Sequence, residues 1–488
     1  MARPFILGLD IGTSSVRAAL FDLNGRLIPK TLVKNDRSLR STRDGGAEID
    51  AELAFKQIVR CVDEVLAATE NSRAEVIAVA ASSFWHSLMG VGKNGKPTTK
   101  VLGWADNRSS GLVRDLRKRL DEHDVHQRTG ARFHSSFWPA KLMWFRREQP
   151  DAFARTTGWL SFSDYVAFRL SGQMATSVSM ASATGIFDQR KCTWDDELAR
   201  FLKIKQRQLP TVTQSSNHFQ LNRSFSRRWP RLSGAKWFPA IGDGAANNIG
   251  SGCVTKRRAA LMVGTSGAMR IAYTGAPPEK IPDGLWCYRI DRDRVIVGGA
   301  LSDGGGLYTW LRQRLRSPKN LDAIISKRRP ALHGLTFLPF IAGERSTGYH
   351  ENAAGAVIGM TSVTDTVDVV EAAMEAVAFR FAEVADQLAE VAEFDDIIAS
   401  GGALRSSKVW TGLIADVLSR ALRFVPVPEA SLRGAVLLAL ETLGNIESIE
   451  QVLPEGGRIF EPNADNHAVY ERARQQHEHY YDLIIKNT

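Results

Sequence analysis

The start of the chain alternates short apolar runs with turns, a pattern that predicts β-strands. Phe5–Asp10 and Val16–Asp22 are both apolar and both end in an aspartate, and a Gly-Thr-Ser-Ser segment between them predicts a tight turn. Asn24-Gly25 is a hairpin signal, after which a third strand is expected. The predicted unit continues with a strand at Leu27–Val33, a helix at Ala51–Thr69 and a strand at Val76–Ala81.

The same pattern restarts about half a chain later. Trp237–Ile241 and Ala259–Val263 predict strands, and a Gly-Thr-Ser-Gly segment separates the second of these from another strand at Ala268–Tyr273. This strand–turn–strand segment repeats the one at the start of the chain, and Thr364–Ala392 adds a long helical pattern. The repetition predicts an α/β fold built from a duplicated unit. We therefore expect two domains, residues 1–240 and residues 241–488.

Length and composition agree with a two-domain enzyme. A chain of 488 residues exceeds the size at which one hydrophobic core keeps growing. Its 44% hydrophobic and 24% charged residues are typical of globular proteins, and no apolar run is long enough to span a bilayer. The four cysteines are widely scattered, and the first ten residues have no signal-peptide pattern. Buried free thiols and a cytoplasmic location are expected.

The formal net charge of +10 raises the question of an anionic partner. Basic clusters lie at Arg223–Arg231 and Lys256–Arg258, but neither has the interleaved aromatic residues or the recognition-helix pattern of a nucleic-acid interface. A solvated basic surface is the simpler interpretation, and no nucleic-acid or membrane partner is expected. An anionic small-molecule substrate also agrees with the charge.

The two Gly-Thr-Ser turns are candidate phosphate sites. A turn of this kind offers several backbone N–H groups and two hydroxyls to an anion, and a pair in corresponding halves suits a nucleotide held between two related domains. Asp10 precedes the first turn and is expected to act on Mg²⁺ through water, since Mg²⁺ uses few carboxylates. No P-loop, dinucleotide-binding or zinc-type spacing is present. The residues of the two turns are Gly12, Thr13, Ser14 and Ser15, and Gly264, Thr265 and Ser266.

Asp243 lies between Gly242 and Gly244, in the segment Ile241–Gly252 that joins the two predicted halves. The glycines permit a tight bend and the close approach of a ligand, so the carboxylate suits a general base or a metal ligand. The alternative is a turn in which Asp243 caps the following helix. A further glycine-containing turn, Gly401, Gly402 and Ala403, ends a predicted strand and is a plausible seat for adenosine, although a simple connection between strand and helix explains it equally well.

Two stretches of the first half have the mixture of aromatic and hydrogen-bonding side chains that binds sugars. One is Ser82–Met89, which places His86 and Ser87 just after a buried strand. The other, at residues 104–108, holds Trp104, Asp106 and Arg108. Structural alternatives stay open for both: a buried core histidine, a tryptophan that only packs, and a local ion pair.

These motifs resemble those of the FGGY family of carbohydrate kinases, and the resemblance covers nearly the whole chain. Residues 10–17 (DIGTSSVR) are similar to the family's first phosphate motif, residues 264–266 to its second, residues 242–245 to its catalytic-base motif and residues 401–403 to its adenosine motif. Residues 141–145 (KLMWF) resemble the core of one family signature, although Phe137-Trp138 depart from its usual spacing. Residues 355–360, 368–369 and 372–375 fit the other signature throughout.

The resemblance implies two ribonuclease H-like domains, as in actin, hexokinase and the Hsp70 ATPase, with a catalytic cleft between them. It implies ATP-dependent phosphorylation of a sugar or sugar acid, with Mg²⁺ as cofactor. Asp243 is then the general base and contacts substrate and metal, Asp10 acts on the metal, and Arg17 joins the first phosphate turn. A homodimer is common in this family.

Within the family, several stretches are most similar to gluconate kinases, including Ser179–Asp188, Gly298–Gly306 and Phe337–Arg345. The carboxylate of gluconate requires a cation, for which Arg108, Lys141 and His86 are the candidates. A pentulose kinase such as xylulose kinase is the nearest alternative, and residues 346–350 depart from the gluconate kinase pattern. An actin- or Hsp70-like ATPase that uses nucleotide closure to drive binding is the alternative from another class.

Overall fold

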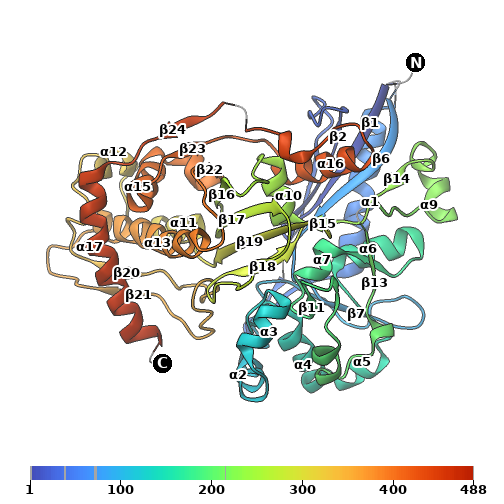
Figure 1. The fold of residues 1–488 in the computed structure, drawn as a ribbon, viewed down its shortest axis with the longest axis horizontal. Coiled ribbons are helices and arrows are strands. Elements are labelled where there is room, and N and C mark those ends of the chain that lie inside the picture. The colour runs from blue at the N-terminus through green and yellow to red at the C-terminus, as the bar shows by residue number, and fades with distance from the viewer. Residues whose placement is uncertain (1–2, 38–39, 71–73, 215, 455, 487–488) are drawn as a thin grey trace.

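Two large β-sheets organise the protein, whose computed structural model describes residues 3–37, 40–70, 74–214, 216–454 and 456–486 (Figure 1). The first sheet has the order β14-β6-β1-β2-β3, with β15 also paired to β6, and the second has the order β18-β19-β17-β16-β22-β23-β24. The strands of the first sheet are β1 (Arg3–Ile11), β2 (Ser15–Phe21), β3 (Val33–Asp36), β6 (Ala74–Ser83), β14 (Lys236–Trp237) and β15 (Ile241–Gly242). Those of the second are β16 (Arg258–Val263), β17 (Gly267–Thr274), β18 (Trp286–Arg289), β19 (Arg294–Leu301), β22 (Asp396–Ser400), β23 (Leu422–Phe424) and β24 (Arg458–Phe460).

The pairing pattern confirms the duplication predicted from the repeated turns. In the first sheet β1 is antiparallel to β2 and parallel to β6, and in the second β16 is antiparallel to β17 and parallel to β22. The next strands outward repeat the match, because β3 and β19 are antiparallel while β14 and β23 are parallel to their neighbours. One long helix belongs to each unit, α1 (Ala51–Ala68) and α13 (Thr366–Ala389).

The third strand begins later than the sequence predicts. The hydrophobic pattern favours a strand over Leu27–Val33, but β3 begins at Val33, and Leu27 forms only an isolated bridge with Phe21. Pro29 lacks the N–H that a ladder requires, and Lys30 has a φ of 63°. The chain therefore turns where the hydrophobic pattern alone predicts extension.

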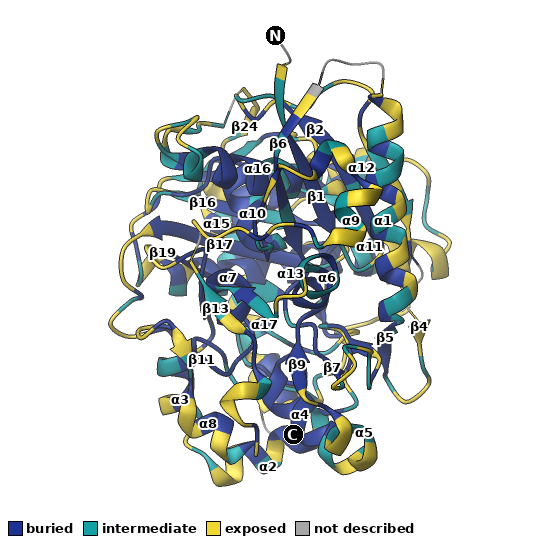
Figure 2. Ribbon diagram, turned by 90° about the vertical axis from the view of Figure 1, so that its right-hand side faces the viewer, coloured by how far each residue is buried: buried dark blue, intermediate teal, exposed yellow. Residues whose placement is uncertain are grey.

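Helices α10 (Asp243–Gly250) and α16 (Ala430–Thr442) cross where the two halves meet. Both are mainly buried (Figure 2), and α16 packs on β1 and β6 although it lies far from them in sequence (Figure 1). A Cβ on Gly250 would lie 1.9 Å from the Ala430 carbonyl oxygen, and a Cβ on Gly434 would lie 1.8 Å from that of Ala246. Only glycine permits this approach.

The segment between β6 and β14 carries most of the remaining helices of the first half. Its apolar core centres on buried tryptophans, among them Trp138 and Trp159. The helices are α2 (Ser110–Arg119), α3 (Glu122–Thr129), α4 (Trp138–Glu148), α5 (Pro150–Arg155), α6 (Phe162–Ser171), α7 (Val178–Ser182), α8 (Asp196–Phe201) and α9 (Arg223–Arg228). The second half adds α11 (Gly305–Arg314), α12 (Leu321–Ile325), α14 (Gly402–Ser406), α15 (Lys408–Leu418) and α17 (Ala464–Tyr481).

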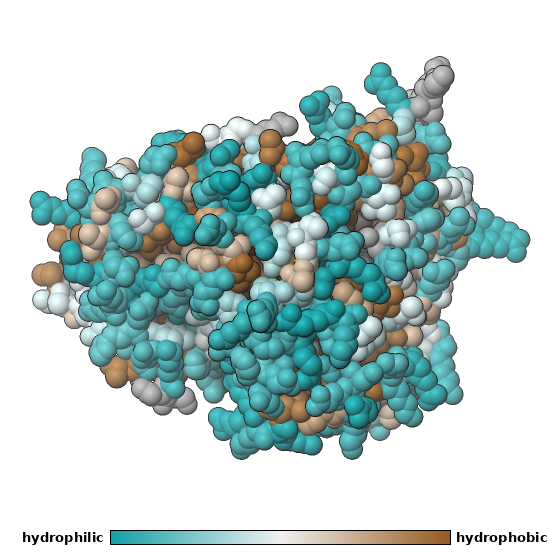
Figure 3. Space-filling model, in the orientation of Figure 1, coloured by the Kyte–Doolittle hydropathy of each residue, from teal (hydrophilic) through white to brown (hydrophobic). Residues whose placement is uncertain are grey.

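Among the described residues, small sheets of two or three strands accompany the two large ones. Short strand pairs link β4 (Arg40–Ser41), β5 (Ala47–Ile49) and β8 (Val101–Leu102), then β7 (Met89–Val91) with β9 (Gly158–Leu160), β10 (Ala175–Ser177) with β13 (Thr211–Thr213), β11 (Phe187–Asp188) with β12 (Thr193–Trp194) and β20 (Thr336–Leu338) with β21 (Ala356–Ile358). The face drawn in Figure 3 is mainly hydrophilic. All four cysteines are free and buried, as predicted. Within the described ranges, no helix combines the length and apolarity needed to cross a membrane.

Candidate active site

Three neighbouring strands of the first sheet end at one edge and bring the predicted acidic residues together. Asp10 of β1 and Ile241 of β15 both lie opposite Ser82 of β6. The Ser82 hydroxyl donates a hydrogen bond of 2.7 Å to Asp10. Burial raises the pKa of Asp10, while this hydrogen bond and the nearby Arg17 oppose the rise. The register therefore fixes Asp10 beside the strand that leads into Asp243.

Asp243 is the first residue of α10, and the residue that caps this helix is Gly242. The alternative prediction, that Asp243 is the N-cap, is therefore wrong. Its carboxylate instead accepts a hydrogen bond of 2.8 Å from the N–H of Gly244, and the residue as a whole is half-buried. Burial raises its pKa to about 6, with Asp10 contributing to the rise and Arg270 opposing it. A carboxylate with this pKa is ionised at neutral pH and remains basic enough to accept a proton.

The ring of Trp85 explains the two glycines around Asp243. A Cβ on Gly242 would lie 1.8 Å from Trp85 Cε2, and one on Gly244 would lie 2.5 Å from Trp85 Cζ3. The sequence predicts that the glycines admit a ligand, but the group that approaches them is this indole, whose Nε1 donates to the Ser179 carbonyl at 3.1 Å. Trp85 thus sets the position of the backbone that carries Asp243.

Asp10 and Asp243 are two carboxylates at one site, each with a raised pKa. Asp10 raises the pKa of Asp243 because two nearby negative charges repel. A divalent cation relieves such repulsion, so the pair fits a Mg²⁺ site that takes its other ligands from water and phosphate. Three or more His, Cys, Asp or Glu side chains grouped for a metal are not found among the described residues.

The first Gly-Thr-Ser turn is closed by a backbone hydrogen bond and keeps exposed residues. The Gly12 N–H donates to the Ser15 carbonyl at 2.9 Å, which closes the turn between β1 and β2. Thr13 and Ser14 keep exposure, whereas Ser15 is buried in β2. Arg17 lies 3.1 Å from Glu429 and 3.5 Å from Asp10, so its charge is already shared between two carboxylates.

The second turn meets two other glycine segments. The carbonyls of Gly264 and Thr265 accept hydrogen bonds of 2.8 and 2.9 Å from Gly305 and Gly306, at the start of α11. Gly401, with a φ of 106°, lies against Val263, where a Cβ would be 2.2 Å from the carbonyl oxygen. A Cβ on Gly305 would lie 2.7 Å from that of Ala403. The structure thus brings together the residues predicted to hold ATP in the second half: Gly264, Thr265, Ser266, Gly401, Gly402 and Ala403.

In the first half, His86 is half-buried and Ser87 is fully buried. His86 Nδ1 is 2.7 Å from the Ala183 carbonyl, a contact that requires the proton on Nδ1, and burial lowers the pKa of His86 to about 3. The ring is therefore neutral. The fully buried Ser87 hydroxyl accepts a hydrogen bond of 3.0 Å from the N–H of Phe162, and this bond joins the segment after β6 to the start of α6. Contact of either residue with substrate stays a prediction.

Asp106 and Arg108 form the local ion pair that the sequence left open. Arg108 donates to Asp106 at 2.7 Å and to Glu48 at 2.8 Å, and its guanidinium lies 4.4 Å above the ring of Trp144. Lys141 is fully buried and donates to the carbonyls of His86 and Ser136 at 2.7 and 2.6 Å. Of the three cations considered for a substrate carboxylate, Arg108 is therefore paired, Lys141 is bound to backbone and His86 is neutral.

Trp104 belongs to a contact that the sequence analysis did not anticipate. The guanidinium of Arg345, from the second half, lies 4.8 Å from the centre of the Trp104 ring. Arg270 is a second residue that sequence reasoning missed, and its charge lowers the pKa of Asp243. Arg345 ends the family-like stretch at residues 337–345, and Arg270 lies four residues after the motif at residues 264–266, so the motifs marked the regions but not the roles of the side chains.

Comparison with known proteins agrees with the family resemblance over most of the chain. Residues 5–230 match the N-terminal domain, and residues 259–443 the C-terminal domain, of the FGGY family of carbohydrate kinases. A gluconokinase of Bacillus subtilis is 27% identical over 92% of this chain and 89% of its own. A xylulose kinase of Staphylococcus epidermidis is 24% identical over 100% and 98%.

Solved structures include close relatives of both kinds. A gluconate kinase and a ligand-bound xylulose kinase, both from Lactobacillus acidophilus, are each 27% identical with a TM-score of 0.91. Each comparison covers 99% of this chain and 98% of the other. The backbone therefore resembles a kinase of a sugar acid and a kinase of a ketose equally well.

Proposed function

The chain belongs to the FGGY family of carbohydrate kinases, and from that premise we propose that it transfers the γ-phosphoryl group of ATP to the terminal hydroxyl of D-gluconate, giving 6-phosphogluconate. The single observation that carries the proposed chemistry is the Asp243 carboxylate, which lies near Asp10 on a backbone packed against Trp85 and whose pKa burial raises to about 6. The similarity to a gluconokinase and to a gluconate kinase supports the choice of substrate.

A sugar hydroxyl is a weak nucleophile that must lose its proton as the new P–O bond forms. We assign the acceptance of that proton to Asp243, which also orients the attacking oxygen. Trp85 fixes the backbone on both sides of Asp243, so the base is positioned before substrate binds. Arg270, whose charge lowers the pKa of Asp243, favours the ionised form of the base.

The two Gly-Thr-Ser turns would receive the phosphates of ATP. Their exposed residues, Thr13, Ser14 and Thr265, offer N–H and hydroxyl donors, and Gly401–Ala403 beside the second turn would seat the adenosine. Asp10 and Asp243 would hold Mg²⁺, which when bound neutralises charge on the phosphates. The domain boundary near residue 240, a homodimer and a cytoplasmic location remain predictions.

A coupled assay of ADP release with D-gluconate, D-xylulose, L-ribulose and glycerol tests the proposal. We expect the highest kcat/KM with D-gluconate. Brisk turnover of a ketopentose without turnover of gluconate would establish a pentulose kinase instead, the alternative that the xylulose kinase of L. acidophilus favours. ATP hydrolysis unaffected by any sugar would point to an actin- or Hsp70-like ATPase.

A further inference from the structure

Arg345 is a half-buried cation near Asp243 that, like Arg270, forms no ion pair among the described residues. Its Nη2 donates to the Leu301 carbonyl at 2.9 Å, while its Nε is buried without a hydrogen-bond partner. A guanidinium has five donors, so most of them remain unused here. Burial lowers the pKa of Arg345, since the charged form loses hydration, and the nearby tyrosines and the carboxylates of Asp303 and Asp243 oppose this only in part.

The surroundings of Arg345 join the two halves of the molecule. Its guanidinium stacks on Trp104 of the first half at 4.8 Å, and its charge acts on both His86 and Asp243. Another carboxylate that acts on it is Asp303, which accepts a hydrogen bond of 3.0 Å from the N–H of Ala342. The guanidinium thus faces the predicted sugar-binding residues with donors to spare.

Arg270 also has buried N–H groups without hydrogen-bond partners, but it lies beside Asp243, where the phosphoryl group would be transferred. A Cβ on Gly244 would be 3.3 Å from Arg270 Nε, and Arg270 is the cation that acts most strongly on Asp243. A group held by Arg270 would therefore lie beside the base. Arg345 instead lies against Trp104, so the two arginines mark two ends of one site.

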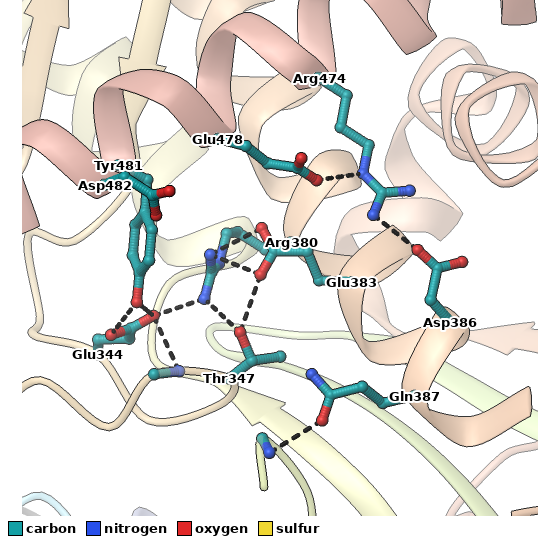
Figure 4. Close-up of polar contacts among 12 residues, drawn as sticks. Glu344, Thr347, Arg380, Glu383, Asp386, Gln387, Arg474, Glu478, Tyr481 and Asp482 are labelled. Carbon is teal, nitrogen blue, oxygen red and sulfur yellow. Dashed lines mark hydrogen bonds and ion pairs between the residues drawn. The ribbon is translucent and has the colours of Figure 1, made fainter. Parts of the chain in front are cut away.

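The loop that carries Arg345 is anchored by the neighbouring residue, Glu344 (Figure 4). Glu344 accepts hydrogen bonds of 2.8 and 2.9 Å from the hydroxyl of Tyr481 on α17 and pairs with the buried Arg380 of α13. It also accepts from the N–H groups of Gly348 and His350, both at 3.2 Å. This network fixes the loop before substrate binds, so Arg345 loses little freedom on binding.

We propose that Arg345 binds the carboxylate of a sugar-acid substrate, whose carbon chain lies along Trp104 with its far hydroxyl at Asp243. The planar guanidinium matches a carboxylate through two parallel hydrogen bonds. This inference rests on the proposed function and assigns its selectivity for acids to one side chain. Arg108, the cation suggested by sequence, is excluded because two carboxylates already pair with it.

The test compares D-gluconate with D-glucitol, which has the same hydroxyls but a neutral CH₂OH in place of the carboxylate. In Arg345→Gln we expect the KM for gluconate to rise about 10²-fold, as the loss of a charged hydrogen-bonded contact predicts. The kcat at saturating gluconate stays within a few-fold of wild type because Asp243 is untouched. The inhibition constant of D-glucitol, measured as a competitor, is unchanged.

The matched control is Arg314→Gln. Arg314 also stacks on a tryptophan, Trp310, at 4.6 Å, but is exposed at the end of α11. Arg314→Gln should leave the KM for gluconate and the inhibition constant of D-glucitol unchanged. Arg345→Lys, which keeps the charge and is less disruptive, should recover part of the affinity for gluconate, and thermal melting checks that each variant is folded.

Different results would contradict the proposed gluconate kinase activity and the proposed role of Arg345. Wild-type enzyme that turns over a ketopentose but not gluconate overturns the proposed function. Wild-type enzyme that uses gluconate while Arg345→Gln leaves its KM unchanged, or weakens gluconate and D-glucitol equally, overturns only the assignment of Arg345.

Discussion

The two Gly-Thr-Ser hairpins share one strand pairing but differ in the charge around them. In the first, Asp10 lies two residues before the turn and is joined by Ser82 and Arg17. In the second, Met262 occupies the place of Asp10, and the turn is bound by the backbone of Gly305 and Gly306. The first turn therefore has a carboxylate and an arginine beside it, whereas the second turn is bound by glycine and neutral backbone.

This contrast shows how a duplicated unit can divide the work of phosphoryl transfer. Charged groups whose pKa is raised by burial suit proton transfer and metal binding. Backbone N–H groups and small residues suit an anion and a flat base, since they permit close approach at fixed geometry. Substitutions of the carboxylates beside the first hairpin should therefore change the chemical step, and those in the glycine segments around the second hairpin should change the affinity for nucleotide.

The largest effect should follow from removing the proposed base. Asp243→Asn keeps the shape but cannot accept a proton, so we expect kcat to fall by about 10²–10⁴-fold while ATP and sugar still bind. Steady-state kinetics and calorimetric titration measure the two quantities. The matched control is Asp164→Asn, another buried aspartate whose pKa is raised to about 6, which should retain turnover. Near-wild-type turnover in Asp243→Asn would place the base elsewhere.

Asp10→Asn probes the carboxylate beside the first hairpin. We expect the Mg²⁺ concentration for half-maximal rate to rise about 10–100-fold, because Asp10 is assigned a supporting role through water. The rate should recover at high Mg²⁺, unlike that of Asp243→Asn. A titration of Mg²⁺ at fixed ATP measures this shift, and an unchanged Mg²⁺ requirement would contradict the role of Asp10.

The pH dependence sharpens the contrast further. Burial raises the pKa of Asp243 to about 6, and the base acts only when ionised. The kcat/KM for gluconate should therefore be constant above about pH 6 and fall about tenfold per pH unit below it. Gluconate itself remains ionised over about pH 5–7, given ordinary carboxyl values of about 4. A profile without an acid limb near this pH would contradict Asp243 as the base.

Sequence periodicity and motifs predicted the architecture well because those signals are local. The repeated hairpins revealed the duplication, and the two glycines around Asp243 marked the position of the proposed base. Apart from the late start of β3, which has a local cause, the failures concern contacts between distant segments. Trp85 occupies the space that Gly242 and Gly244 leave, and Arg345 meets Trp104 across the two halves. No pattern within one segment encodes either contact, whereas Asp106 and Arg108, two residues apart in sequence, pair with each other.

The smallest expected effect tests the glycine segment beside the second hairpin. A Cβ on Gly402 would meet no heavy atom within 4 Å, so Gly402→Ala adds a methyl group that the folded protein accommodates. If adenosine lies against this turn, the methyl group meets the nucleotide instead, and the KM for ATP should rise about tenfold with kcat and melting temperature unchanged. Gly111→Ala, equally open but on α2 of the first half, should leave the KM for ATP unaltered. An equal response of the two variants would mean that Gly401–Ala403 does not hold the adenine base as proposed, and the contrast between the charged and the neutral hairpin would then rest on the phosphates alone.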